Sequence, residues 1–422
     1  MKRHVIVGNG GAAISAVRAI RSVTAEDEIT LVSQEDGPAY SPMLTPYYLA
    51  GRLSRRDLFI CPQSFYRQHR VKALLGRKAS GVNTRAGMVL LEDGSALPFD
   101  SLLIATGASA VRLTMSGMDL PGVFCLRTLA DAQGILRASK RARKVLFIGG
   151  GLVSLEVAQA LFREGLGMTF VVGSGHILSQ NVDAPCAAMV QARLEQHGVS
   201  FLLGDDLVSL EKEGRKLRAV TNQGKELEAD MVVVGRGVRP NVDLVRGSGV
   251  KMNNGIVVDE TLRASVEGIY AAGDVAEGMD IATGRPHVNA TWPNAIGQGW
   301  TAGLNMAGKK TPYLRNVRVN ICTLFGLPFA SVGAVRGDGE GHQVLASRVG
   351  GSYRKLVFQG DVLIGALLAG DVADAGILAN RVEQRKPSLD LRRAGPRSTA
   401  FLPFARNLVV IGKEVGYGSA GL

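Results

Sequence analysis

Two segments of this sequence repeat one pattern: an apolar strand, a glycine-rich turn and a helix with a regular apolar face. The first runs from the strand His4–Val7 through Gly8, Gly10 and Ala13 into a helix, with the spacing G-x-G-x-x-A. The first glycine allows a tight turn, the second lets a pyrophosphate approach the backbone, and the small third residue lets helix and strand pack closely. Free N–H groups at the helix start then face the anion. We therefore predict a dinucleotide site at this turn.

A carboxylate follows the next strand, where such a unit binds a ribose. The strand Glu28–Val32 is followed by Gln34, Glu35 and Asp36. An acid about 20 residues beyond the glycines is the usual partner of the ribose hydroxyls, and we assign this role to Glu35. A lone glycine motif is a weak signal, but strand, turn, helix, strand and acid in this order are specific.

The same unit returns in the middle of the sequence. The strand Lys144–Ile148 leads into a turn with Gly149, Gly151 and Ser154, and a helix follows from Leu155. Two units mean either two dinucleotides or one duplicated fold, and a flavoprotein reductase needs two dinucleotides. We predict an α/β fold with two Rossmann-like dinucleotide-binding domains.

The second copy lacks the ribose-binding acid. Its second strand, Met168–Val172, is followed by Gly173, Ser174 and Gly175, and no arginine stands where it would clearly bind a 2′-phosphate. The choice between NADH and NADPH is therefore open at this point, and a weakened nicotinamide site is an alternative.

Composition narrows the class further. A length of 422 residues suits roughly two to four domains, and 53 glycines with only 5% aromatic residues suit an α/β protein with many tight turns. No apolar run is long enough to cross a membrane and no signal-peptide pattern opens the sequence, so we expect a cytoplasmic protein without membrane insertion. The four cysteines are widely spaced, and we expect no metal site.

The formal net charge is +12, and basic residues cluster, for example at Arg52, Arg55 and Arg56. Such a field favours an acidic partner, such as a small electron-carrier protein, although dispersed charge that maintains solubility is the alternative. Charge alone also suits nucleic acid, but the sequence has neither zinc-finger spacing nor an aromatic-rich RNA-binding strand. We expect no nucleic-acid partner.

Three further segments carry a family resemblance. The sequence reads LIATG at Leu103–Gly107, VGRGVRPN at Val234–Asn241 and TLRASVEGIYAAGD at Thr261–Asp274. With the two glycine motifs, they resemble the pyridine nucleotide-disulfide oxidoreductase family, in the branch of rubredoxin reductases, ferredoxin reductases and the flavin domains of nitrite reductases. The resemblance extends over about residues 1–385. It implies FAD and NAD(P)H as cofactors.

The resemblance assigns candidate site residues to both cofactors. Asp274 would hold the ribityl or phosphate part of the flavin, and the helix that begins near Pro293 would point at the flavin ring. For FAD the implied residues are Gly8, Gly10, Ala13, Glu35, Thr106, Gly107, Gly273, Asp274, Pro293 and Asn294. For NAD(P)H they are Gly149, Gly151, Ser154, Glu156 and Gly237.

Two charged residues have two interpretations each. Glu156 follows the second glycine turn and is the candidate catalytic side chain, close enough to shape the hydride-transfer site; an acid that offsets the helix dipole fits its place equally well. Arg127 would lie near the entrance of the NAD(P)H domain by resemblance, or form a surface ion pair.

The resemblance also implies the domain organisation. Residues 1–110 and 252–310 would form a discontinuous FAD-binding domain, with an NAD(P)H-binding domain, residues 111–251, inserted between them. Residues 311–388 would form a C-terminal α+β interface domain, which is compatible with a homodimer or a hetero-oligomer. Residues 389–422 form a tail without an assigned role.

The redox cysteines of the family are missing. Aligning Pro46-Tyr47-Tyr48 with the family puts Met43 in the place of the single reactive cysteine, and a thioether cannot act as a thiolate nucleophile. Disulfide reductase activity is therefore not expected, and Met43 would pack against the flavin or the protein core. Pro42 stands where rubredoxin reductases often carry arginine, which leaves the acceptor less defined.

These observations predict an FAD-dependent NAD(P)H:acceptor oxidoreductase. Hydride would pass between nicotinamide and flavin N5, and electrons would pass to or from an iron-sulfur or rubredoxin-like protein. One alternative is the FAD-bearing subunit of a multi-subunit dehydrogenase, for example a ferredoxin-linked 2-oxoacid:acceptor oxidoreductase, with iron-sulfur subunits as partners. Another is a flavin-bearing regulatory subunit whose nicotinamide site has decayed.

Overall fold

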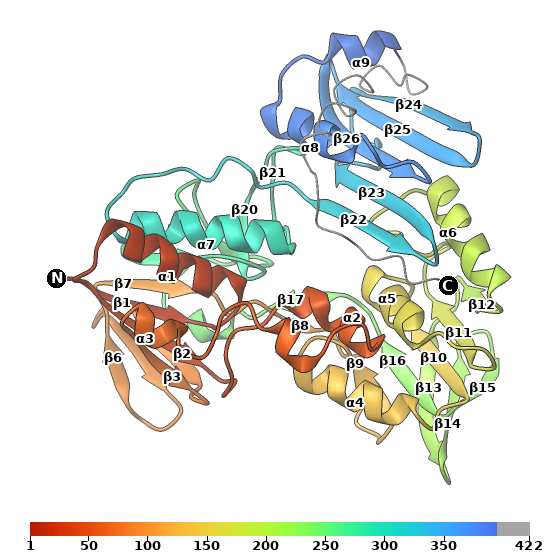
Figure 1. Ribbon diagram of the computed structural model, residues 1–422, viewed down its shortest axis with the longest axis horizontal. Helices are drawn as coiled ribbons and strands as arrows, with labels where there is room; N and C mark the ends of the chain where they lie inside the picture. The colour runs from red at the N-terminus through yellow and green to blue at the C-terminus, as the bar shows by residue number, and fades with distance from the viewer. Residues whose placement is uncertain (395–422) are drawn as a thin grey trace.

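The first glycine unit lies at the centre of a parallel five-stranded sheet (Figure 1). In the computed structural model, which describes residues 1–394, the strand order is β19-β7-β1-β2-β3, and each neighbouring pair is parallel. The strands are β1 Arg3–Val7, β2 Glu28–Ser33, β3 Val71–Leu75, β7 Ser101–Ile104 and β19 Ile269–Ala271. The predicted Rossmann-like arrangement of the first half is confirmed.

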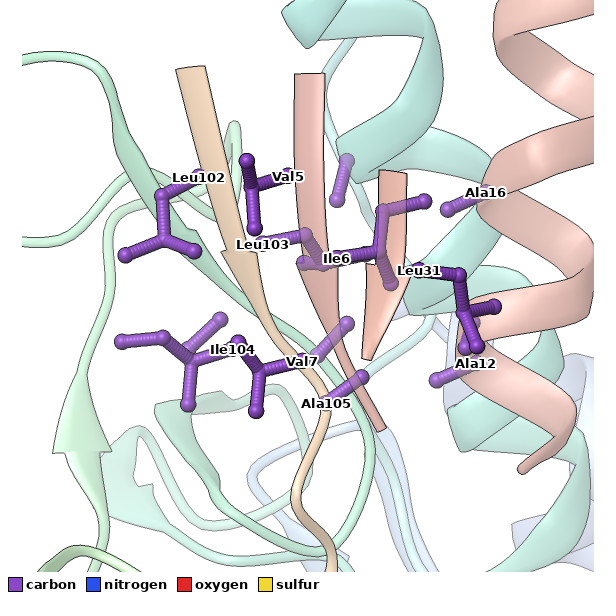
Figure 2. Close-up of a cluster of buried hydrophobic side chains, with 14 of the residues drawn as sticks. Val5, Ile6, Val7, Ala12, Ala16, Leu31, Leu102, Leu103, Ile104 and Ala105 are labelled. Carbon is purple, nitrogen blue, oxygen red and sulfur yellow. The ribbon is translucent and has the colours of Figure 1, made fainter. Parts of the chain in front are cut away.

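The strands of this sheet are short apolar runs buried on both faces, as is typical of parallel sheets. Figure 2 shows side chains of β1 and β7, such as Val5 and Leu103, beside one another, with Ala12 and Ala16 on the neighbouring helix α1 (Gly11–Val23). Val5 and Leu103 are at most 2% exposed. The cluster anchors the strand that delivers the first glycine turn.

A second helix, α7 (Trp292–Met306), lies along α1 at a short distance. A methyl group on Gly299 would lie 2.1 Å from the carbonyl oxygen of Ala12, and one on Gly303 would lie 2.5 Å from that of Ala16. Glycine at these two positions therefore lets the helix backbones touch. This contact fixes α7 relative to the glycine turn that precedes α1.

Short elements complete the first domain, and several of them form one antiparallel sheet, β4-β5-β6, and one mixed sheet, β18-β20-β21. They are η1 Pro42–Leu44, α2 Thr45–Leu49, η2 Arg55–Leu58, α3 Phe65–Gln68, β4 Ala79–Asn83, β5 Met88–Leu91, β6 Ala96–Pro98, β18 Ile256–Val257, β20 Ala276–Asp280 and β21 Arg285–His287.

The second glycine unit forms an equivalent parallel sheet with the order β12-β11-β10-β16-β9. A three-stranded antiparallel sheet, β13-β14-β15, follows β12. The strands are β9 Val123–Cys125, β10 Lys144–Ile148, β11 Gly167–Val172, β12 Ser200–Leu203, β13 Leu207–Glu213, β14 Lys216–Thr221, β15 Glu226–Ala229 and β16 Met231–Val234. The helices are α4 Leu129–Ser139, α5 Leu152–Leu161 and α6 Ala184–Gln196. The second predicted dinucleotide fold is thus also confirmed.

Two chain crossings connect these domains. The outgoing strand β8 (Ala108–Ala110) pairs antiparallel with the returning strand β17 (Val238–Pro240). A short turn, η3 (Asp243–Val245), follows, and its Leu244 and Val245 are buried in the core of the first domain. The chain therefore re-enters the first domain near β17, earlier than the predicted residue 252, because these apolar side chains belong to the first core.

The C-terminal domain is an antiparallel sheet of the order β22-β23-β26-β25-β24 with two helices, which confirms the predicted α+β domain. Side chains of this sheet, including Leu327 and Phe329, share a core with Leu155 and Cys186 of the second domain. Figure 1 shows β22 and β23 beside α5 and α6. The elements are β22 Val319–Leu324, β23 Leu327–Gly333, β24 His342–Val349, β25 Ser352–Gln359, β26 Val362–Ala369, α8 Ala375–Gln384 and α9 Leu389–Ala394.

The beginning of the predicted tail belongs to this C-terminal domain. Leu391, in α9, is 4% exposed and joins its core. The remainder of the predicted tail, residues 395–422, lies outside the described residues. Within residues 1–394, no helix has the length and apolar character needed to span a membrane.

Candidate cofactor-binding site

A cavity of about 590 Å³ opens at the carboxyl ends of β1, β2 and β7. Ligands of open α/β sheets bind outside these strand ends. Five of the residues predicted for the first dinucleotide line the cavity: Gly8, Gly10, Glu35, Thr106 and Gly107. The fold thus brings together segments that are up to 100 residues apart in the sequence.

The glycine turn leaves an open helix end in this cavity. Gly8 has a φ of +125°, and a methyl group there would lie 2.1 Å from the Ala105 carbonyl oxygen, so the turn requires glycine. Gly10 caps α1 without a side-chain hydrogen bond, and a methyl group on it would meet nothing within 4 Å. Ala13 is fully buried between helix and strand. The first N–H groups of α1 therefore remain available to a phosphate.

Glu35 stands on the cavity wall, and its role as the ribose-binding acid stays a prediction. The hydroxyl of Tyr40 donates to its Oε1 atom at 3.3 Å and accepts the backbone N–H of Leu129 at 3.1 Å. Partial removal from water raises the pKa of Glu35, although the Tyr40 hydrogen bond opposes that shift. Tyr40, which the sequence analysis did not single out, thus ties the acid to the start of α4.

Arg127 joins the two domains at the cavity. Its Nη2 atom donates to Asp274 Oδ2 at 2.7 Å, and its Nε atom donates to the Ala108 carbonyl oxygen at 2.7 Å. The Arg127 side chain is 29% exposed and that of Asp274 16%. Of the two interpretations of Arg127, the structure therefore shows an ion pair, but one in the cavity wall instead of on the open surface. Asp274 is placed beside the cavity by Arg127, which lines it, and its contact with the flavin stays a prediction.

The two chain crossings are joined by side-chain hydrogen bonds beside the cavity. The Thr106 hydroxyl donates to the Asn241 carbonyl oxygen at 2.8 Å, and Asn241 Nδ2 donates to the Thr106 carbonyl oxygen at 2.9 Å. Ser109 Oγ donates to Asn241 Oδ1 at 2.7 Å. Asn241 also lines the cavity and was noted in the sequence only as part of a family motif.

The start of α7 lies next to the second flavin motif. Gly273, with a φ of +82°, donates its N–H to Gln298 Oε1 at 2.8 Å. Pro293 occupies the first turn of α7, and the helix cap has no side-chain hydrogen bond. Asn294 is 3% exposed, and its amide is engaged by Val317 and Tyr313. These contacts show that Asn294 fastens the helix start to the following chain.

The second glycine turn repeats the first in detail. Gly149 has a φ of +99°, and a methyl group on it would lie 2.4 Å from the Gly235 carbonyl oxygen. Gly151 caps α5 without a side-chain hydrogen bond. Ser154 is fully buried, where its small size lets α5 approach Gly235. Gly237, with a φ of +88°, begins the return crossing.

Glu156 is partly buried on α5, close to strand β22 of the C-terminal domain. Burial raises its pKa to about 7, because the ionised carboxylate loses water. The neighbouring thiol of Cys322 on β22 also has a raised pKa, first because it is buried and second because Glu156 is close. Glu156 thus sits in an apolar interface, where its charge state changes near neutral pH.

Met43, at the position of the family's reactive cysteine, faces solvent in the described residues. Met43 is 56% exposed and Tyr47 49% exposed, whereas Tyr48 packs against the second core. All four cysteines are free, and Cys61, the nearest in sequence, is buried. Met43 therefore does not pack into the protein core, which was one of its two predicted positions.

The chain belongs to the pyridine nucleotide-disulphide oxidoreductase family, whose pattern matches residues 2–299. Residues 319–386 match the rubredoxin NAD⁺ reductase C-terminal domain. The predicted family, the cofactors FAD and NAD(P)H and the assignment as an FAD-dependent NAD(P)H oxidoreductase are thereby confirmed.

Several relatives share most of the chain. The NADH-dependent phenylglyoxylate dehydrogenase subunit epsilon of Aromatoleum evansii is 30% identical and covers 98% of this chain and 97% of its own length. The rubredoxin-NAD(+) reductase of Pseudomonas putida is 32% identical over 73% of this chain and 80% of its own length. The putidaredoxin reductase in a covalent complex with putidaredoxin has the same fold, with a TM-score of 0.87, 24% identity and coverage of 98% of this chain and 99% of its own.

The residues present fit FAD in the first domain. The cavity combines an uncapped helix N-terminus for the pyrophosphate, a carboxylate for the ribose and an Arg127–Asp274 pair beside the start of α7. Gly8 has no side chain, and a methyl group there would collide with the Ala105 carbonyl oxygen and displace the turn. The fit rests on donors and acceptors that this chain itself places around the cavity.

Replacing Arg127 with alanine should weaken FAD binding by about ten-fold or more. The change leaves the carboxylate of Asp274 without its cation beside the cavity and removes a charge-assisted hydrogen bond. Arg112→Ala, which removes an exposed pair with Asp119, is the matched control. FAD titration of the apoprotein, followed by flavin fluorescence, measures both affinities. Equal affinities for the two variants would contradict the role of Arg127.

The raised pKa of Glu156 predicts a pH-dependent stability. Between pH 4.5 and 7 the unfolded chain releases this proton and the folded chain keeps it, so stability falls as pH rises through this window. A shift of this size corresponds to about 3 kcal/mol, since one pKa unit is worth about 1.4 kcal/mol. Urea unfolding at pH 5 and pH 8 should show that Glu156→Gln removes this loss. Glu164→Gln, an exposed carboxyl control, should leave it unchanged.

Proposed function

We propose that the chain is an FAD-containing reductase that takes electrons from NADH and passes them to a small iron-sulfur or rubredoxin-like carrier protein. The first domain binds FAD at the cavity beside Gly8, Glu35 and Asp274, and the second binds the nicotinamide dinucleotide at the turn that contains Gly149 and Gly151. The observation that carries the proposal is the complete first cavity next to a second glycine turn of the same geometry. The reductase relatives and the rubredoxin-reductase type of C-terminal domain support it.

Bound FAD would supply the redox chemistry, namely hydride acceptance from the nicotinamide and one-electron transfer to a carrier protein. The protein supplies position and electrostatics. The open N-terminus of α1 holds the pyrophosphate, and the N-terminus of α7 presents partial positive charge beside the second flavin motif. The missing thiol at Met43 leaves an outside acceptor as the route for the electrons.

A basic segment offers the carrier a docking surface. Residues 41–58 form a loop whose two ends meet beside the cavity wall. The Ser41 N–H donates to the Leu58 carbonyl oxygen at 2.9 Å, and Tyr40 pairs with Phe59. Arg55 and Arg56 are exposed in η2, at the returning end of this segment, two to three residues before Leu58. With the net charge of +12, they favour an acidic partner close to the flavin.

The double change Arg55→Glu with Arg56→Glu should lower kcat/KM for an acidic rubredoxin or ferredoxin by about ten-fold or more at low ionic strength. In the variant, repulsion replaces attraction between the enzyme and the acidic carrier. Salt screens both forces, so the kcat/KM values of the variant and the wild type should become equal near 0.5 M salt, where the Debye length is about 4 Å. The measurement is anaerobic, NADH-driven reduction of the carrier followed by its visible spectrum.

Menadione, a neutral acceptor, serves as the control for this pair of changes and should be reduced at an unchanged rate. Loss of activity with menadione would show damage to the enzyme itself. A wild-type protein that is reduced by NADH but passes electrons to no rubredoxin or ferredoxin would contradict the proposed acceptor.

A second candidate function is the FAD subunit of a multi-subunit 2-oxoacid dehydrogenase. The full-length match to a dehydrogenase subunit epsilon favours it, because that relative and this chain cover each other almost completely. Purification of the tagged chain from its own cells separates the two candidates. Iron-sulfur subunits in a stable, stoichiometric complex support the subunit role, whereas a single flavoprotein supports the reductase role.

A further inference from the structure

The second dinucleotide turn has no acid directly after its second strand, yet the structure brings a carboxylate to that place from the turn after β12. Asp206 Oδ2 lies 3.2 Å from where a methyl group on Gly173 would be, and Arg236 Nη1 lies 3.3 Å from the same point. The two side chains form an ion pair with an Nη2–Oδ2 distance of 2.6 Å. The absence of a side chain at Gly173 therefore lets this acid and base pack directly against the strand end.

The two halves of the chain can be aligned through their backbone hydrogen bonds. Gly8 donates to the carbonyl of Val32 at 2.8 Å, and Gly149 donates to that of Val171 at 2.8 Å. Continuing along the second strand from these matched residues makes Ser174 the equivalent of Glu35.

The third strands align in the same way. Gly76 donates its N–H to the Glu35 carbonyl oxygen, and Gly204 donates its N–H to that of Ser174, both at 3.1 Å. Two residues further on, Lys78 becomes the equivalent of Asp206.

This alignment shows where Asp206 and Arg236 lie relative to the second ligand. Lys78 lines the cavity of the first domain, so the alignment places its equivalent, Asp206, at the matching position of the second domain. The turns after the sheets match as well, because Ala105 and Gly235 occupy the same position against the first glycines. Thr106, another residue of the first cavity, is then the equivalent of Arg236.

We propose that Asp206 supplies the ribose-binding carboxylate of the nicotinamide dinucleotide, one strand removed from its usual place, and that Arg236 completes this subsite. The inference rests on the proposed function, because it requires that the second turn binds NADH. Asp206 accepts hydrogen bonds from the 2′- and 3′-hydroxyls of the adenosine ribose, and Arg236 donates to one of their oxygens. The same carboxylate repels a 2′-phosphate, so the enzyme prefers NADH to NADPH.

Local hydrogen bonds hold Asp206 ready for this role. Its Oδ1 atom accepts the Leu207 N–H at 2.9 Å, which leaves Oδ2 directed at Arg236. The buried side chain of Asp205 accepts the Asp206 N–H at 2.9 Å and thereby braces the turn between β12 and β13. Both side chains of the ion pair remain about one-third exposed, so a ligand hydroxyl can reach them.

The test measures KM and kcat for NADH and NADPH with menadione as acceptor. Asp206→Ala should raise KM for NADH by about ten-fold or more and reduce the preference for NADH over NADPH. The value of kcat should stay nearly unchanged, because the adenosine end of the dinucleotide is far from the hydride. Asp206→Asn keeps the shape and one acceptor oxygen, so its KM for NADH should rise less while its discrimination against NADPH falls.

Glu226→Ala is the matched control, since it removes an exposed carboxylate that pairs with Arg218 at 2.7 Å in the neighbouring antiparallel sheet. It should leave both KM values unchanged. Unchanged KM values and unchanged discrimination in both Asp206 variants would overturn the inference, whereas a wild-type flavin that NADH and NADPH both fail to reduce would overturn the proposed function first.

Discussion

Both dinucleotide sites depend on one close contact between backbones. At the end of the central strand of each parallel sheet, the first glycine of the turn touches a carbonyl of a neighbouring loop: Gly8 touches Ala105, and Gly149 touches Gly235. A side chain at either glycine would push the helix away from the sheet. The helix start then could not face the cavity, so the phosphate site and its position beside the acid depend on this contact.

The crossings between the domains place the two sites relative to each other. Thr106 and Asn241 exchange hydrogen bonds through their side chains and carbonyls, and Arg127 reaches from the second domain to Asp274 of the first. The flavin side and the nicotinamide side are therefore held by polar contacts that are only partly buried. The C-terminal sheet adds an apolar contact beside Glu156, and burial there raises the pKa of Glu156 to about 7.

Local sequence patterns were sufficient for the fold and for the glycine turns, because strand, turn and helix are neighbours along the chain. They were not sufficient for contacts made by residues distant in sequence. Tyr40 at Glu35, Arg127 at Asp274 and Asp206 at Gly173 each join segments that only the folded sheets bring together. The missing acid after β11 suggested a weakened site, since the sequence does not show that the end of β12 lies beside it.

The central claim is that this chain carries both a flavin and a working nicotinamide site. The most direct measurement is an anaerobic titration of the purified FAD-containing protein with NADH, followed by the visible flavin band. The account predicts that about one equivalent of NADH bleaches the bound flavin. Bound flavin that keeps its colour with both NADH and NADPH would contradict it and would indicate a subunit that receives electrons from a protein partner.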